Sequence, residues 1–418
     1  MDIKLSKSTI QNNESIIITG SKSESNRLLI LQALYPKIKI GNLSNSDDTK
    51  LLQKALQVSS SPDSYRDSID IHHAGTAMRF LTAYFASQKG VEINLTGSAR
   101  MKERPIKILV DALQSLGADI SYLENEGFPP LKIRGKDLDI SQVKLPANIS
   151  SQYISALMLI APKLKNGLEI ELIGEITSIP YIEMTLTLLK QVNIEANFQD
   201  KKIKIKPKKE LEKEYNLIVE SDWSSASYWY SIVALSPKGT TIELSFYNEN
   251  SLQGDSALAE IYEKFGVKTT YNKTIIKLVK TEIISSNNQI DLDLTKTPDI
   301  AQTIAVTAFG LGLRCDLTGL HTLKIKETDR LIAIKNELEK FGAQINITDN
   351  SLHLSSNNNF LGSYSPKIET YNDHRMAMAF APLALKTNLS IKNAYVVSKS
   401  YPEFWDDLKQ VGFQISNK

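Results

Sequence analysis

The sequence contains a single cysteine, Cys315, among 418 residues. One thiol excludes a disulfide framework and a cysteine-rich metal site, and it fits a reducing compartment. No segment is apolar for the length that crossing a bilayer requires. The opening stretch "MDIKLSKSTIQNNESIIITG" lacks an apolar run of the signal-peptide type. We therefore expect a cytoplasmic protein without membrane contacts, in which Cys315 lies on a buried strand.

The sequence also lacks an excess of either charge, because 49 basic and 47 acidic residues leave a formal net charge of +2. This balance gives no argument for nucleic acid as a partner, although a local basic cluster can still bind an anionic ligand. Hydrophobic content of 42% and charged content of 23% are typical of a globular protein. The length predicts two or more domains.

One pattern recurs along the chain. It consists of an amphipathic helix, a Gly or Asn, and two short alternating runs joined by a polar turn. The Gly or Asn, which suits a left-handed helix cap, falls at Gly117, Asn193, Gly266, Gly342 and Gly412, positions 70 to 76 residues apart. The last copy, "FWDDLKQVGFQIS", is truncated. The period predicts about six copies of one α+β unit, arranged as two pseudo-symmetric lobes of three.

Basic and hydroxyl side chains cluster where helices are predicted to begin. The clusters lie in "GSKSESNR", "HHAGTAMRF", "ARMKERPI", "NISSQYISALMLIAP", "IKETDRLIAIKNELEKFGA" and "YNDHRMAMAF", and Lys399 precedes a Pro turn. Helix starts favour phosphate and carboxylate groups. Each cluster alone is equally typical of capped, solvated helix ends. Together they predict a positively charged cleft for phosphate and carboxylate ligands.

Two acidic residues accompany these cations, and both are candidates for proton transfer. Asp299 lies in "KTPDIAQTIAV", and Glu327 follows Lys326 directly. The spacing predicts Lys326 and Arg330 on one face of the same helix. The adjacent His72 and His73 lack the spacing of a helical metal site, so we expect no metal.

Nine ordered blocks of the sequence resemble the 5-enolpyruvylshikimate-3-phosphate synthase family. The blocks are "GSKSESNR", "AGTAMR", "RMKERPI", "SSQYISAL", "SIPYIEMT", "SSASY", "NSLQGD", "KETDRL" and "YNDHRMAMAF". The resemblance implies an α/β fold of two lobes, each built from three βαβαββ units in an inside-out barrel-like arrangement. It implies one lobe from residues 1–20 and 220–418 and the other from residues 21–219, with the active site in a cleft that closes over substrate.

The reaction implied by the resemblance transfers the enolpyruvyl group of phosphoenolpyruvate to the 5-hydroxyl of shikimate 3-phosphate and releases phosphate. Asp299, Glu327, Lys326 and Lys22 would be catalytic, with Asp299 as the base near the hydroxyl. The implied contacts of shikimate 3-phosphate are Lys22, Ser23, Arg27, Ser150, Ser151, Gln152, Ser178, Tyr181, Asp299 and Lys326. Those of phosphoenolpyruvate are Lys22, Gly75, Arg104, Gln152, Arg330, Arg375 and Lys399. The resemblance implies no cofactor.

Several positions depart from the family pattern. His73 and Thr322 each replace an Asn, Phe80 replaces a Pro, Trp223 replaces a small residue and Glu24 replaces an apolar one. None of these changes removes an implied catalytic group, so we expect them to affect substrate affinity and inhibitor response.

The main alternative is the sibling family that transfers enolpyruvyl to UDP-N-acetylglucosamine. That family usually has Lys-Asn at the first loop, where this chain has Lys22 followed by Ser23. A non-catalytic anion-binding protein is a second alternative, which the presence of Asp299 and Glu327 disfavours. We expect a monomer that acts on small molecules and binds no nucleic acid.

Overall fold

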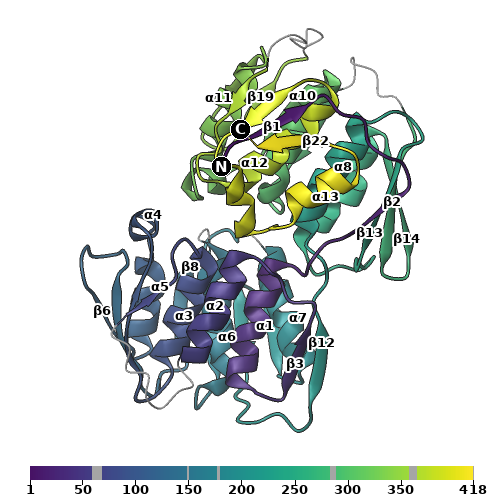
Figure 1. Cartoon of the computed structure of the whole chain (residues 1–418). Helices are drawn as coiled ribbons and strands as arrows, with labels where there is room; N and C mark the ends of the chain where they lie inside the picture. Colours follow the sequence, from purple (N-terminus) through teal and green to yellow (C-terminus); the bar gives the residue numbers. More distant parts are fainter. Residues whose placement is uncertain (59–67, 148–149, 177–178, 283–288, 357–364, 418) are drawn as a thin grey trace. The chain divides into compact units, whose positions relative to one another are not determined.

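The structure is a computed structural model, and it describes residues 1–58, 68–147, 150–176, 179–282, 289–356 and 365–417 (Figure 1). The chain forms two compact units. Unit 1 comprises Met1–Thr19 and Glu220–Lys418, and unit 2 comprises Gly20–Val219. The chain therefore leaves unit 1 after Thr19 and returns to it at Glu220.

Unit 2 contains two four-stranded sheets and one parallel pair of strands. The strands of the first sheet are β4 (Ile69–Asp70), β5 (Glu92–Thr96), β7 (Leu131–Arg134) and β6 (Asp119–Tyr122). Those of the second are β8 (Gln142–Pro146), β9 (Leu168–Ile173), β11 (Lys202–Ile205) and β10 (Ala196–Gln199). The parallel pair is β3 (Ile38–Gly41) and β12 (Tyr215–Ile218).

Unit 1 contains three four-stranded sheets. The first consists of β2 (Glu14–Ile17), β13 (Thr241–Ser245), β15 (Ile275–Lys280) and β14 (Val267–Asn272). The second consists of β16 (Gln289–Asp293), β17 (Arg314–Thr318), β19 (Leu352–Leu354) and β18 (Ile345–Ile347). The third consists of β20 (Lys367–Ile368), β21 (Leu389–Ile391), β1 (Ile3–Ser6) and β22 (Gln414–Asn417).

These five four-stranded sheets share one topology in the described chain. A parallel pair of strands is followed by two antiparallel pairings, as in β4–β5–β7–β6 and β16–β17–β19–β18. The third sheet of unit 1 reaches this order because β1 supplies the strand that the truncated last repeat lacks. The sixth copy has no hairpin in the described residues and keeps only β3 and β12. The predicted α/β repeat is therefore confirmed, with a reduced sixth copy.

Some helices of each unit are fully buried and others lie partly at the surface. In unit 2 the helices are α1 (Lys22–Leu34), α2 (Asp47–Val58), α3 (Gly75–Ala86), α4 (Ala99–Lys102), α5 (Lys107–Ser115), α6 (Ser151–Ile160) and α7 (Ile179–Gln191). In unit 1 they are α8 (Trp223–Leu235), α9 (Leu258–Ile261), α10 (Ala301–Leu311), α11 (Arg330–Glu339), α12 (His374–Phe380) and α13 (Phe404–Gln410). Short 3₁₀ turns include η4 (Pro298–Ile300), η5 (His321–Ile325), η6 (Ala381–Leu385) and η7 (Ala394–Lys399).

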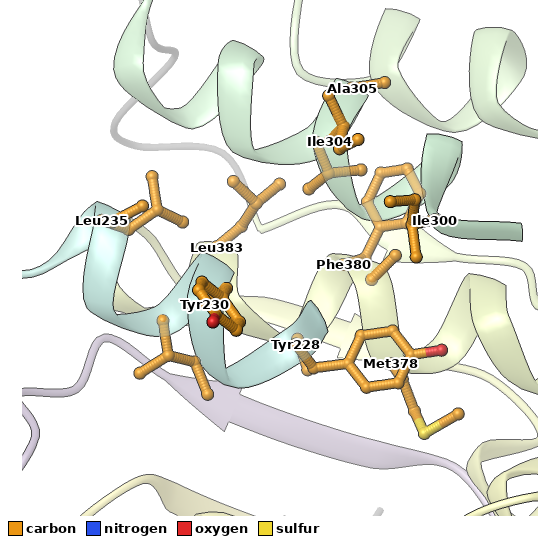
Figure 2. Close-up of a cluster of buried hydrophobic side chains, with 14 of the residues drawn as sticks. Tyr228, Tyr230, Leu235, Ile300, Ile304, Ala305, Met378, Phe380 and Leu383 are labelled. Carbon is orange, nitrogen blue, oxygen red and sulfur yellow. The ribbon is translucent and has the colours of Figure 1, made fainter. Parts of the chain in front are cut away.

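Several helices are buried on every side, whereas many strands alternate between buried and exposed residues. Every residue of α3 and α12 is buried, and in α8 every residue except the half-buried Ser224 is buried, while β5 and β8 expose alternate side chains. A helix that is apolar all round belongs in a core. Figure 2 shows this core in unit 1, where α8 contributes Tyr228 and α10 contributes Ile304, close to Phe380 of α12. The inside-out arrangement follows from this distribution.

The repeat markers have the predicted backbone conformation. Gly117, Asn193, Gly266, Gly342 and Gly412 all have positive φ, between 58° and 104°. Asn tolerates this region better than most side chains do, which explains the one substitution. Cys315 is buried on β17, as predicted. No helix among the described residues is long and apolar enough to cross a membrane.

Gly20 lies where the chain enters unit 2, and a side chain there would collide with the backbone. A Cβ at Gly20 would lie 1.9 Å from the carbonyl oxygen of Asn42 and 2.8 Å from Cγ1 of Val219. We expect Gly20→Ala to destabilise unit 2 by about 1–3 kcal/mol through overpacking. Gly41→Ala, where the added Cβ would lie 3.6 Å from Cγ1 of Ile218, is the matched control and should have little effect.

The three tryptophans, Trp223, Trp229 and Trp405, all lie in unit 1. Tryptophan fluorescence therefore reports the unfolding of unit 1, whereas far-UV circular dichroism reports both units. Urea unfolding followed by far-UV circular dichroism should show an earlier transition in Gly20→Ala, while tryptophan fluorescence stays closer to that of the wild type. Equal stability of the Gly20 and Gly41 variants would contradict the collision.

Candidate functional site

The predicted site residues of unit 1 gather around one buried arginine. Arg330 is the first residue of α11, and its side chain is 2% exposed. Its Nη1 lies 2.9 Å from Oδ1 of Asp299, its Nη2 lies 2.8 Å from Oε2 of Glu327, and its Nε lies 2.7 Å from Oδ2 of Asp373. Three carboxylates from separate segments thus meet at one guanidinium, and together they raise its pKa despite burial.

The carboxylate of Asp373 does two tasks at the start of α12. It is fully buried, and its Oδ1 accepts a hydrogen bond of 2.8 Å from the backbone N–H of Arg375. The same side chain pairs with Arg330. Asp373 therefore joins the starts of α11 and α12. Asp373 lies within the block "YNDHRMAMAF", from which no role was predicted for it. An Asp before an apolar helix is typical of an N-cap, and this local pattern could have predicted its capping role.

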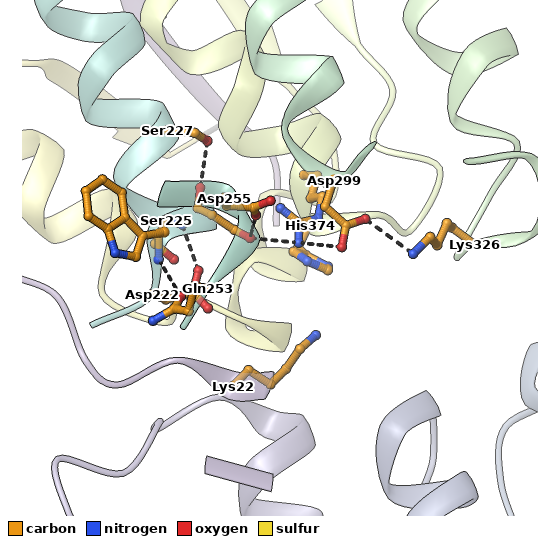
Figure 3. A network of polar contacts seen from close by, with 12 residues as sticks. Lys22, Asp222, Ser225, Ser227, Gln253, Asp255, Asp299, Lys326 and His374 are labelled. Atoms are coloured by element: carbon orange, nitrogen blue, oxygen red, sulfur yellow. Dashed lines mark hydrogen bonds and ion pairs between the residues drawn. The ribbon is translucent and has the colours of Figure 1, made fainter. Parts of the chain in front are cut away.

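Asp299, just before α10, is surrounded by cations. Lys326 Nζ lies 3.3 Å from its Oδ1, and Arg375 Nη2 lies 3.4 Å from its Oδ2. Figure 3 shows Lys326 and Asp299 pointing toward one another. Burial alone would raise the pKa of Asp299, but Lys326, Arg375 and Arg330 hold it well below its usual value. Asp299 is therefore ionised and is a weak base in this arrangement.

A second acidic residue reaches Arg375 through a serine. Arg375 Nη2 donates a hydrogen bond of 3.2 Å to Ser224 Oγ, and Ser224 in turn donates to Oδ2 of Asp255. Burial, followed by the neighbouring charge of Asp299, raises the pKa of Asp255 to about 6. Asp255 lies in the quoted block "NSLQGD", but the sequence analysis assigned it no function.

The prediction that Lys326 and Arg330 share a helical face is wrong. The α11 helix begins at Arg330, and Lys326 has an extended conformation that caps the end of η5. The reason is the N-cap: the Asp329 carboxylate accepts hydrogen bonds from the backbone N–H groups of Leu331 and Ile332. Lys326 reaches Asp299 from the segment that precedes the helix.

Lys399, at the end of η7, donates a hydrogen bond of 2.6 Å to the carbonyl oxygen of Asn372.

In unit 2, a buried arginine holds one set of predicted residues together. Arg27 Nη1 donates to the carbonyl oxygen of Ser23 at 2.7 Å, and its guanidinium lies 5.7 Å from the ring centre of Tyr181. The guanidinium also donates to Ser155 and Thr185, each at 2.8 Å. Burial lowers the pKa of Arg27 to about 10. Lys22, the first residue of α1, lies 3.7 Å from Asp48.

A second set in unit 2 forms where α3 begins. Gly75 is the first residue of α3, and a Cβ there would lie 2.6 Å from Arg104 Nη1, so the arginine packs directly against the glycine. Gln152 Nε2 donates a hydrogen bond of 3.0 Å to Thr76 Oγ1. Ser150 caps α6 by accepting from the N–H of Gln152, and Ser151 is the first residue of that helix. Ser178 lies outside the described residues.

The described predicted residues therefore form local groups within each unit. In unit 1, Asp299, Lys326, Glu327, Arg330 and Arg375 belong to one network of ion pairs. In unit 2, Gly75, Arg104 and Gln152 gather at α3, while Ser23, Arg27 and Tyr181 gather at α1. Among the described residues, no group of three or more His, Cys, Asp or Glu side chains is arranged to hold a metal ion.

The fold and these side chains define an α/β protein with repeated units, in which cations and carboxylates collect at helix starts. Residues 57–408 match the family model described as EPSP synthase (3-phosphoshikimate 1-carboxyvinyltransferase). The chain belongs to this family.

Relatives of known name and solved structures agree with this assignment. A 3-phosphoshikimate 1-carboxyvinyltransferase from Bacteroides fragilis is 46% identical over 415 residues, which cover 98% of this chain and 96% of the relative. One from Haemophilus influenzae is 37% identical, with 95% of this chain and 96% of the relative covered. The structure of EPSP synthase from Acinetobacter baumannii matches with a TM-score of 0.78 over the whole of both chains, at 19% identity, and supports the fold.

Asp255 should make the stability of unit 1 fall as pH rises. Its pKa is about 6 in the folded chain against an ordinary value of 3.8, so between these values the folded state binds more protons than the unfolded state. Stability then decreases with pH, by about 3 kcal/mol in total across that window. Asp255→Asn keeps the acceptor for Ser224 and removes the titration.

Urea unfolding between pH 4.5 and 7.5, followed by tryptophan fluorescence, measures this effect in unit 1. The wild type should lose stability relative to Asp255→Asn as pH rises. Parallel curves for the two proteins would show that Asp255 does not titrate in this range.

Proposed function

We propose that this chain transfers the enolpyruvyl group of phosphoenolpyruvate to the 5-hydroxyl of shikimate 3-phosphate. The observation that carries the proposal is membership of the EPSP synthase family across nearly the whole chain. The reaction belongs to the shikimate pathway, which leads through chorismate to the aromatic amino acids. The family match does not favour the alternative acceptor UDP-N-acetylglucosamine. A monomeric state and a cytoplasmic location stay predictions.

In this proposal, the two units are the two lobes of the family, and the cations bind the charged groups of both substrates. Phosphoenolpyruvate is contacted by Lys22, Gly75, Arg104, Gln152, Arg330, Arg375 and Lys399. Shikimate 3-phosphate is contacted by Lys22, Ser23, Arg27, Ser150, Ser151, Gln152, Ser178, Tyr181, Asp299 and Lys326. Planar guanidinium groups suit carboxylate and phosphate oxygens. Closure of the lobes would exclude water and strengthen these interactions.

The proposed chemistry is addition followed by elimination. The 5-hydroxyl oxygen bonds to C2 of phosphoenolpyruvate and loses its proton to Asp299, while C3 gains a proton and becomes a methyl group. The resulting tetrahedral intermediate then loses phosphate and one methyl proton, which restores the double bond. Glu327, Lys326 and Lys22 take part in these proton transfers. The acid and base must lie within hydrogen-bond reach of the reacting atoms.

The ion pairs of Asp299 bear on its role as the base. Lys326, Arg330 and Arg375 stabilise its ionised form, which makes it a poor proton acceptor in the free protein. When these cations turn toward substrate anions, the stabilisation weakens and the pKa of Asp299 rises. The base therefore becomes stronger only when substrate is bound.

The reaction is tested by measuring phosphate release from the purified protein. Phosphoenolpyruvate with shikimate 3-phosphate should release phosphate continuously, and omission of either substrate should abolish the release. Replacement of shikimate 3-phosphate by UDP-N-acetylglucosamine should also abolish it. Release with the nucleotide sugar alone would favour the alternative acceptor.

Glu327→Gln tests the proposed proton transfer separately from binding. We expect turnover to fall by about 10²–10⁴-fold because an acid–base group is lost, while affinity for shikimate 3-phosphate changes little. Glu339→Gln is the matched control, since Glu339 lies on α11 and its ion pair in the described chain is with Lys335 of the same helix. Steady-state turnover and calorimetric binding of shikimate 3-phosphate measure the two effects. Normal turnover in Glu327→Gln would remove Glu327 from the mechanism.

A further inference from the structure

Arg79 connects the two segments that carry Gly75 and Arg104. It lies on α3, one turn after Gly75, and is only 4% exposed. Its Nη1 donates to the carbonyl oxygen of Gly75 at 3.2 Å, and its Nη2 donates to the carbonyl oxygen of Pro105 at 3.0 Å. The guanidinium group therefore bridges the start of α3 and the residue that follows Arg104.

The electrostatic surroundings of Arg79 differ from those of Arg330. Within the part of the chain that the structure describes, no carboxylate of Asp or Glu forms an ion pair with Arg79, in contrast to Arg330 with its three carboxylates. Burial and then the like charge of Arg104 lower the pKa of Arg79 to about 10. Taking an unpaired charge out of water is unfavourable. Carbonyl dipoles and the ring of Tyr153, 6.0 Å from the guanidinium carbon, offset part of this cost.

The bridge also fixes the backbone beside Arg104. The carbonyl oxygen of Pro105 accepts a second hydrogen bond of 2.5 Å from the hydroxyl of Tyr153. Proline has a fixed φ, so holding its carbonyl oxygen restricts the peptide that follows Arg104. At the other end of the bridge, Gly75 contacts the Arg104 guanidinium directly. Arg79 thus donates hydrogen bonds to the segment that carries Gly75 and to the segment that carries Arg104. These two segments are in contact where Arg104 packs against Gly75.

We propose that Arg79 is a positioning residue for phosphoenolpyruvate: it holds Arg104 against Gly75, and its unpaired charge adds to that of Arg104. This inference rests on the proposed binding of phosphoenolpyruvate by Gly75 and Arg104. An anion bound there supplies the negative charge that the surrounding residues do not. Arg27 and its contacts Ser23 and Tyr181, which are proposed to bind shikimate 3-phosphate, gather at α1 and have no hydrogen bond to Arg79 in the described chain, so we expect the main effect on phosphoenolpyruvate.

Two substitutions at Arg79 separate its charge from its geometry. Arg79→Lys keeps the charge, but an ammonium on a flexible stem does not reproduce the planar fork. We expect the KM for phosphoenolpyruvate to rise about 10-fold, the value of one lost charged hydrogen bond. Arg79→Met also removes the charge, and the rise should approach about 100-fold. In both variants the KM for shikimate 3-phosphate should stay near the wild-type value.

Three further variants complete the experiment. Tyr153→Phe removes only the hydroxyl donor to Pro105 and should raise the KM for phosphoenolpyruvate less than Arg79→Lys does. Arg134→Met removes an exposed arginine of unit 2 that pairs with Glu92, and both KM values should be unchanged. Arg104→Met tests the underlying site and should raise the KM for phosphoenolpyruvate strongly. If Arg79→Met does not fold, Arg79→Lys and Tyr153→Phe still decide the question.

The outcomes distinguish the inference from the site on which it rests. If Arg104→Met leaves the KM for phosphoenolpyruvate unchanged, the proposed binding site is wrong. If Arg104→Met raises it but Arg79→Lys does not, the site stands and the role of Arg79 is overturned. A lower melting temperature in Arg79→Lys with both KM values unchanged, or with both raised equally, would make Arg79 a purely structural residue.

Discussion

The organisation of unit 1 depends on the ion pairs between Arg330 and its three carboxylates. Asp299 precedes α10, Glu327 precedes α11 and Asp373 precedes α12, so one guanidinium ties together the segments that open three helices. Asp373 is fully buried, and a buried carboxylate without its partner costs several kcal/mol. The positions of Arg375 and Asp299 follow from the same network, because Arg375 comes two residues after Asp373 and pairs with Asp299. Asp299, Glu327 and Lys326, three of the side chains proposed for catalysis, are therefore held in place before any substrate arrives.

The buried arginines of unit 2 have different hydrogen-bond partners from those of unit 1, and this difference affects how each unit would bind an anion. Arg27 and Arg79 donate to hydroxyl and carbonyl oxygens, whereas Arg330 and Arg375 face carboxylates. The sequence alone predicted a positively charged cleft that also contains Asp299 and Glu327, but it cannot say which acids pair with which bases. In unit 1 an incoming anion must compete with Asp299 for its cations. In unit 2, Lys22 pairs with Asp48, but Arg27 and Arg79 form no ion pair with a carboxylate in the described chain, so an anion near them meets no such competition.

Short-range features of the chain were predictable, and long-range pairings were not. The left-handed markers such as Asn193 follow from local backbone preference, and the burial of Cys315 follows from its apolar neighbours. The pairing of Ile3 with Asn417 joins the two ends of the chain, and no local pattern identifies it. The reduced sixth copy is equally unpredictable from local pattern, because its two strands, Ile38–Gly41 and Tyr215–Ile218, lie far apart in the sequence and pair only in the folded chain. The charge pattern predicted Lys326 inside the helix, whereas the N-cap at Asp329 makes α11 begin at Arg330.

The burial of the helices explains why the proposed chemistry collects at their starts. A helix such as α3 or α12, surrounded by core on all sides, can present polar groups only at its ends. Its first N–H groups have no partner within the helix. Asp222, Asp329 and Asp373 satisfy them in α8, α11 and α12 through side-chain caps. Among the described residues, α1 and α3 have no such side-chain cap, and these helices begin at Lys22 and Gly75. Two helix starts of unit 2 without a side-chain cap, those of α1 and α3, thus coincide with residues proposed to bind phosphoenolpyruvate, although the start of α5 also lacks such a cap. An anion at α1 or α3 can take the place that Asp occupies in unit 1.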